Sequence, residues 1–163
     1  MKVSFTHEIE APIEKVNEAY RSADFYRAKQ KNSGATEVVV LEHEQVDEAR
    51  TRLKAEVTEP SRVPRFLRKS EVDTYVDESL LDTETGTLSW KVTPDKMADV
   101  FFLSGKIEFT AAGDRTRVTY HTELEVKIPL VGKKAEKIGL EKTEEETERQ
   151  ARFLQSWLDG RAS

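Results

Sequence analysis

The chain has 163 residues, of which 35% are charged and 37% hydrophobic, with a formal net charge of -5 and no cysteine. This length suits one domain with its own core, so we expect a single domain over residues 1–163. The lack of cysteine excludes disulfides, zinc–thiolate sites, iron–sulfur clusters and a cysteine nucleophile. A mildly acidic chain without a basic stripe argues against nucleic-acid binding, because Lys and Arg contacts to phosphate supply most of that affinity.

The first eight residues contain no apolar run of the kind found in signal peptides. No stretch approaches the roughly 18 apolar residues of a membrane span. The sequence therefore predicts a cytoplasmic protein without stable membrane insertion, and it leaves the oligomeric state open.

Alternating apolar and polar residues over 3–9 predict a half-buried first strand. Pro12 is favoured at the first position of a helix, and Ser22 suits the N-cap of a second short helix that ends before Gly34. Two short helices are thus expected directly after the first strand.

Most of the remaining chain consists of β-branched and alternating segments separated by short turns. They predict consecutive strands at about 36–46, 52–57, 72–81, 88–92, 101–111 and 117–126. Gly105 inside one of these strands predicts a bend or bulge. Residues 59–69 contain two prolines and predict a loop or a short helix.

After Pro129 the apolar period becomes helical and predicts one long helix from about residue 130 to 159, which Gly160 ends. This order of elements predicts an α+β fold. We expect a curved antiparallel sheet of about six to seven strands wrapped around a long C-terminal helix. Such an arrangement encloses a space between sheet and helix.

Two segments resemble a known superfamily. The first strand followed by Ala-Pro-Ile-Glu-Lys-Val at 11–16 is similar to the opening of START-like (SRPBCC, helix-grip) proteins. The segment at 126–136, with residues 153–158 behind it, resembles an uncharacterised bacterial family of unknown function within that superfamily. The resemblance covers essentially the whole chain. It implies the helix-grip fold and a ligand cavity, as in lipid-transfer domains and polyketide cyclases, but no particular reaction.

Several polar residues share the inward parity of apolar neighbours on the predicted strands, and Thr147 lies near the apolar stripe of the predicted helix. Cavities typically combine apolar walls with a few such polar groups. The predicted ligand-binding residues are His7, Thr74, Trp90, Phe109, Tyr120, Thr122 and Thr147. The same residues also fit a packed core in which their polar atoms bond to backbone or ordered water.

A basic segment lies in the loop with two prolines. Its residues Arg62, Arg65, Phe66 and Arg68 are a predicted gate that contacts a ligand head group, because Arg suits carboxylates and other anions. A solvated surface is the alternative interpretation of the same charges.

The three histidines His7, His43 and His121 lack the spacing of a metal site, so no metal or other cofactor is predicted. The sequence contains no nucleophile elbow and no phosphate-binding glycine loop, and we assign no catalytic residue. The leading hypothesis is therefore non-enzymatic binding or transport of a small hydrophobic or amphipathic molecule, such as a lipid, isoprenoid or polyketide. Two alternatives remain: a cyclase or aromatase-type enzyme using the same cavity, with a few hydroxyls or His7 moving protons, and a protein-interaction module with a packed interior.

Overall fold

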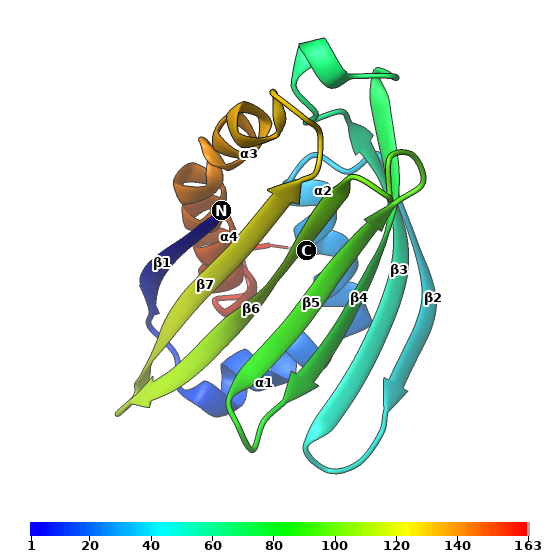
Figure 1. Cartoon of the computed structure of the whole chain (residues 1–163). Helices are drawn as coiled ribbons and strands as arrows, with labels where there is room; N and C mark the ends of the chain where they lie inside the picture. The colour runs from blue at the N-terminus through cyan, green and yellow to red at the C-terminus, as the bar shows by residue number, and fades with distance from the viewer. Residues whose placement is uncertain (163) are drawn as a thin grey trace.

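A computed structural model describes residues 1–162 and confirms the predicted helix-grip architecture (Figure 1). Seven antiparallel strands form one curved sheet in the order β1-β7-β6-β5-β4-β3-β2. The strands are β1 (Lys2–Ile9), β2 (Glu37–Gln45), β3 (Arg50–Pro60), β4 (Val72–Asp82), β5 (Thr87–Pro94), β6 (Phe101–Ala112) and β7 (Arg115–Val126). Strands β2 to β7 form a meander, and β1 joins its far edge by pairing with β7.

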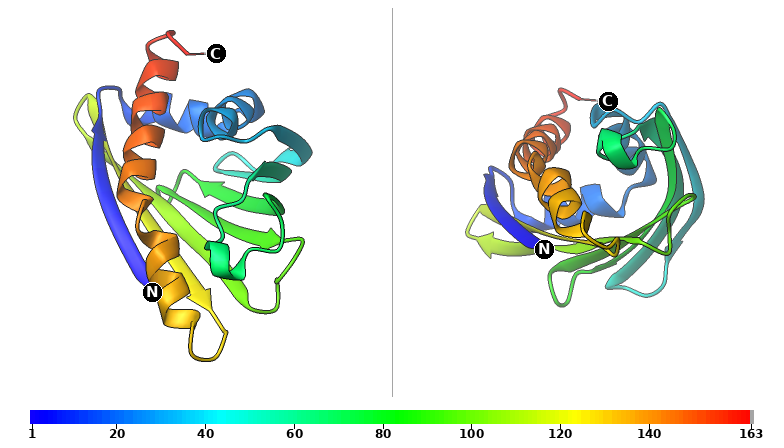
Figure 2. Two further views of the ribbon diagram at one scale, coloured as in Figure 1. Left: turned by 90° about the horizontal axis from the view of Figure 1, so that it is seen from above. Right: turned by 45° about the horizontal axis from the view of Figure 1, so that its top comes forward.

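Four α-helices lie on the concave side of this sheet (Figure 2). They are α1 (Ile13–Arg21), α2 (Ala23–Asn32), α3 (Gly132–Leu140) and α4 (Thr143–Leu158). The hydroxyl of Ser22 accepts a hydrogen bond from the Phe25 N–H, which confirms the predicted N-cap of α2. Within residues 1–162, no helix has the length and apolar character that a membrane crossing requires.

The predicted long C-terminal helix is bent at Glu141 and Lys142, where α3 ends and α4 begins. The bend has a packing cause, because α3 contacts β7 whereas α4 contacts β1, α1 and α2. Gly139 brings α3 close to the sheet: a Cβ atom at this position would lie 2.6 Å from a methyl carbon of Leu124. The helix therefore follows the curve of the sheet.

The main core lies at the end of the sheet that α1, α2 and the second half of α4 cover. Phe25 is its centre, with its ring centroid 5.1 Å from that of Tyr20, 6.0 Å from Phe153 and 5.4 Å from Trp157. Rings at these separations add directional attraction to the burial of apolar surface. This aromatic core closes one end of the fold.

Gly105 keeps the regular register of β6 with β5 and with β7, so the prediction of a bulge at this position is wrong. A Cβ atom at this position would lie 2.6 Å from the ring of Trp90 and closer still to the carbonyl oxygen of His121. The glycine is required because an inward-pointing indole ring occupies the space that a side chain would take.

Candidate functional site

A cavity of about 920 Å³ lies between the concave face of the sheet, α2, the α3–α4 bend and the loop over residues 61–71. Its size falls within the roughly 300–1,000 Å³ typical of sites for small molecules. Apolar walls come from both the sheet and the helices: Leu53, Leu88, Trp90, Ile107, Leu124 and Leu140. The aromatic core therefore fills only part of the space that the sheet and helices enclose.

Four of the predicted ligand-binding residues line this cavity: Trp90, Tyr120, Thr122 and Thr147. Tyr120 is 4% exposed, and its hydroxyl has no hydrogen-bond partner among residues 1–162. The Thr147 hydroxyl is satisfied locally, since it donates to the carbonyl oxygen of Glu144 at 2.9 Å. The structure thus brings together an indole, a phenol and two threonines from three elements.

Two further predicted residues support the cavity wall from behind. His7 is half-buried between β1 and α4, with Nε2 3.0 Å from the Thr147 hydroxyl and its ring centroid 5.8 Å from that of Tyr120. The single Thr147 hydrogen already points at Glu144, so the His7 nitrogen donates in this pair. Phe109 packs in the aromatic core, 5.0 Å from the ring of Tyr20.

The predicted inward position of Thr74 is wrong. Its hydroxyl lies 3.0 Å from that of Thr58 on the convex face of the sheet. The inward parity of β4 instead belongs to Asp73, Tyr75, Asp77, Ser79 and Leu81. The first four of these are polar because this part of β4 faces the cavity rather than the dry core.

Asp77 is the centre of a buried polar group that the sequence interpretation missed. Its Oδ2 atom accepts a hydrogen bond from the Tyr26 hydroxyl at 2.7 Å, and Gln30 Nε2 donates to the same hydroxyl at 2.9 Å. Lys29, one residue before Gln30, also lines the cavity, with Nζ 5.4 Å from the centroid of the Tyr26 ring. We call Tyr26, Lys29, Gln30 and Asp77 the Asp77 cluster.

Burial dominates the protonation equilibria of this cluster. It raises the pKa of the Asp77 carboxyl above its ordinary 3.8, and the charge of Lys29 offsets part of that rise. It also raises the pKa of Tyr26, with the Asp77 charge adding to the effect. Burial lowers the pKa of Lys29. The protonated form of Asp77 and the neutral form of Lys29 are therefore both more favoured, relative to the charged forms, than they are in water.

Replacing Asp77 with Asn is expected to change how stability depends on pH. A carboxyl whose pKa is raised on folding contributes stability below its unfolded pKa and loses it as pH rises through the folded pKa. Asn does not titrate, so the free energy of unfolding of the variant, relative to the natural chain, should increase from about pH 4 to about pH 7. Urea unfolding at both pH values measures this change. The exposed Asp114→Asn is the matched control, and an equal change in both variants would contradict the assignment.

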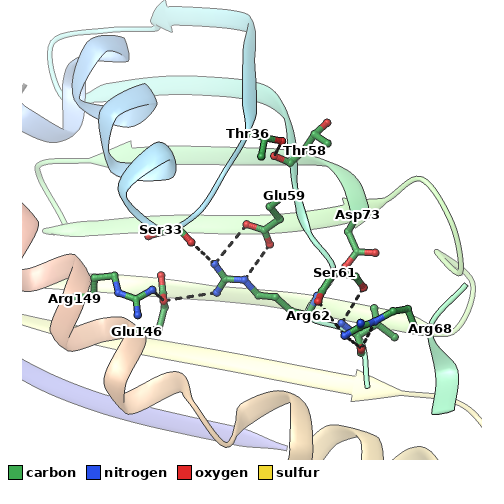
Figure 3. Close-up of polar contacts among 11 residues, drawn as sticks. Ser33, Thr36, Thr58, Glu59, Ser61, Arg62, Arg68, Asp73, Glu146 and Arg149 are labelled. Atoms are coloured by element: carbon green, nitrogen blue, oxygen red, sulfur yellow. Dashed lines mark hydrogen bonds and ion pairs between the residues drawn. The ribbon is translucent and has the colours of Figure 1, made fainter. Parts of the chain in front are cut away.

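The predicted gate residue Arg62 connects three elements beside the cavity (Figure 3). Its guanidinium donates to the carbonyl oxygen of Ser33 at 2.7 Å, and its nitrogens lie 3.2 Å from a carboxylate oxygen of Glu59 and 3.7 Å from one of Glu146. Arg149 holds Glu146 from the other side, with 3.1 Å between nitrogen and oxygen. We call these contacts the Arg62 junction; they link the end of α2, the end of β3 and α4.

The other gate residues take different positions. Arg68 lines the cavity and donates to the carbonyl oxygens of Ser61 and Val63, so it holds the loop in shape. Phe66 is 49% exposed, and its ring lies 5.3 Å from Lys134 Nζ on α3. Arg65 is exposed at the start of the short 3-10 helix η1 (Arg65–Leu67) and does not line the cavity.

The described residues contain no group of three or more His, Asp or Glu side chains placed to hold a metal ion. The side chains of His43 and His121 bond to the carbonyl oxygen of Arg21 and to the hydroxyl of Ser4, respectively. The Asp77 cluster and the Arg62 junction are two polar groups at this cavity, and the side chains within each group contact one another.

Solved structures share this fold at low sequence identity. A protein from Thermus thermophilus matches with a TM-score of 0.71 at 17% identity, over 100% of both chains. The Zhui aromatase/cyclase from Streptomyces sp. R1128 matches with a TM-score of 0.68 at 14% identity, over 99% of this chain and 94% of that one. A START superfamily protein from Mycobacterium smegmatis matches with a TM-score of 0.61 at 17% identity, over 98% of this chain and 97% of that one.

These likenesses confirm the predicted START-like fold. No curated protein matches the sequence significantly. Residues 4–158, nearly the whole chain, match the family described as a protein of unknown function, DUF2505. The chain therefore belongs to the DUF2505 family and has a START-like helix-grip fold.

Proposed function

We propose that the domain binds one small hydrophobic or amphipathic molecule in the cavity between the sheet and the C-terminal helices. The observation that carries this proposal is the cavity of about 920 Å³, which has apolar walls around Trp90 and a polar group at Asp77. Apolar walls supply binding free energy, and a few fixed polar groups orient the ligand. Fold likeness to an aromatase/cyclase and to a START superfamily protein supports the same class of ligand.

In this proposal the apolar part of the ligand contacts Trp90, Tyr120 and Thr122, and its polar end lies near the Asp77 cluster. The loop over residues 61–71 acts as the gate, held by the Arg62 junction. A lipid, an isoprenoid or a polyketide-like chain has this combination of properties. An interaction module with a packed interior is disfavoured, because its interior would not leave a cavity of this volume.

An enzyme of the cyclase or aromatase kind is the second candidate, and the Asp77 cluster favours it. A buried carboxyl bonded to a phenol, next to an amine, supplies groups that can move protons inside a water-poor cavity. His7, the residue first considered for this role, already bonds to Thr147 and does not line the cavity. An acid–base mechanism would therefore use Asp77 and Tyr26.

Native mass spectrometry of the freshly purified protein, followed by denaturing extraction, tests the binding proposal. We expect one small apolar molecule per chain, or one-to-one binding of an added long-chain alcohol such as decanol. A chain that carries nothing and binds no member of a panel of alcohols, fatty acids and aromatic compounds would contradict it.

Replacing Arg62 with Ala is expected to speed ligand release severalfold, because it removes the contacts that hold the gate to α2 and α4. The Arg62 side chain is 51% exposed but that of its partner Glu59 only 11%, so the loss should cost about 1–3 kcal/mol of unfolding free energy. Stopped-flow displacement of a bound fluorescent fatty acid measures the release rate. Arg65→Ala is the matched control, and equal rates in the two variants would show that the Arg62 junction does not hold the gate.

A further inference from the structure

The inner face of α2 presents a lysine to the cavity. Phe25 and Tyr26 are buried on this face, and Lys29 and Gln30 follow one turn later, so all four point to the same side of the helix. Lys29 Nζ lies 5.4 Å from the centroid of the Tyr26 ring. Lys31, on the same helix, is exposed. The amine of Lys29 is thus a cavity group rather than a surface charge.

The two carboxylates whose charges act on Lys29, those of Asp77 and Glu146, already bind other partners. Asp77 accepts hydrogen bonds from Tyr26 at 2.7 Å and from Gln30 at 3.4 Å, and Glu146 pairs with Arg62 and Arg149. Lys29 itself forms no salt bridge in the part of the chain that the structure describes. The Lys29 amine therefore lies on the cavity wall, on the inner face of α2, where a ligand can contact it.

The surroundings also favour the neutral amine. Burial lowers the pKa of Lys29, and the charges of Asp77 and Glu146 offset only part of that effect. A neutral lysine in an apolar cavity is a nucleophile toward carbonyl carbon, whereas an exposed ammonium is not. A ligand held by the apolar walls would place its polar end at this amine.

We propose that Lys29 forms an imine with a ligand that carries an aldehyde or ketone. The inference rests on the proposed function, since the cavity must first bind the ligand. The nitrogen lone pair of Nζ attacks the carbonyl carbon, a C–N bond forms, and the π electrons of the carbonyl move to oxygen. Transfer of a proton from nitrogen to that oxygen completes the carbinolamine.

Asp77 is the group placed to complete the step. Its Oδ1 atom has no hydrogen-bond partner within residues 1–162, while its Oδ2 atom is held by Tyr26. A proton from Asp77 on the carbinolamine hydroxyl lets that group leave as water. The products are one water, a protonated imine on Lys29 and the carboxylate of Asp77 beside it. No oxidant, reductant or metal takes part.

Reductive trapping tests the proposal. The natural chain is incubated at neutral pH with decanal and sodium cyanoborohydride, and intact mass and peptide mapping locate the adduct. We expect one decyl group per chain on Lys29, formed at least about tenfold faster than on Lys31, because the cavity holds the aldehyde beside the Lys29 amine. Labelling spread over exposed lysines, without preference for Lys29, would overturn the inference.

Two variants and one unreactive probe separate the possible failures. Lys29→Arg should lose the specific adduct, whereas Lys31→Arg should keep the adduct and still bind decanol. Thermal unfolding of both variants checks that the fold is retained. Decanol binding without trapping of decanal would overturn the imine and leave the proposed function intact. Failure of both probes to bind would count against the proposed function itself.

Discussion

Phenylalanine in place of Thr122 is expected to abolish binding of apolar ligands while the domain stays folded. Thr122 lies on the inner face of β7, directly opposite Gly105 in the register of β6, and lines the cavity. A benzyl group at this position enters the space that a ligand would occupy. The fold should lose no more than about 1–3 kcal/mol of unfolding free energy, the usual range for an added core group. Affinity for decanol should fall by at least about a hundredfold, or about 2.8 kcal/mol.

Thr119 offers a matched control on the same strand. Its hydroxyl bonds to that of Thr6 on the convex face of the sheet, so Thr119→Phe adds the same ring outside the cavity. Titration calorimetry with decanol compares the two variants. Similar affinities in both would show that the ligand does not bind between sheet and helix.

Alanine in place of Gly105 is expected to destabilise the fold by about 3 kcal/mol, at the upper end of the range for overpacked interiors. The added methyl group meets the ring of Trp90 and the backbone carbonyl of His121, and the carbonyl belongs to a paired strand that cannot move alone. Urea unfolding measures the loss. Ser104→Ala, the neighbouring position, is the control and should change stability by less than about 0.5 kcal/mol.

A double variant separates the two contacts of the Gly105 methyl group. Trp90→Leu removes the ring but leaves the His121 carbonyl in place, so Gly105→Ala should cost less in that background than in the natural chain. An equal cost in both backgrounds would mean that Trp90 does not occupy the space above Gly105.

Most of the fold was predictable because alternation and turn residues report local structure directly. The strand over Arg115–Val126 shows this, since its buried and exposed residues follow the sequence pattern. β4 does not follow its sequence pattern. Its β-branched residues Val72, Thr74 and Val76 suggest an inner face, but they lie on the convex side. Polar residues occupy the true inner positions because a cavity, unlike a dry core, tolerates them.

The candidate site was only partly predictable for a different reason. The inward direction of Trp90, Tyr120 and Thr122 follows from the alternation pattern of the strand that each belongs to. The Asp77 cluster, by contrast, joins α2 to β4 across 51 residues of sequence. The Arg62 junction likewise joins a loop to α4. Single-sequence patterns carry no information about such distant pairs. The one available signal was the run of polar residues at alternate positions of β4.

The pairing of the first strand with the last strand has a consequence for how the chain folds. Strands β2 to β7 assemble through neighbouring hairpins, but Ser4 and His121, which bond between β1 and β7, are 117 residues apart. Contacts at such separation form slowly because the chain must close a long loop first. We expect β1, and the α4 helix that packs against it, to join the sheet after the hairpins of the meander have formed. The binding cavity would then be the last part of the molecule to acquire its walls.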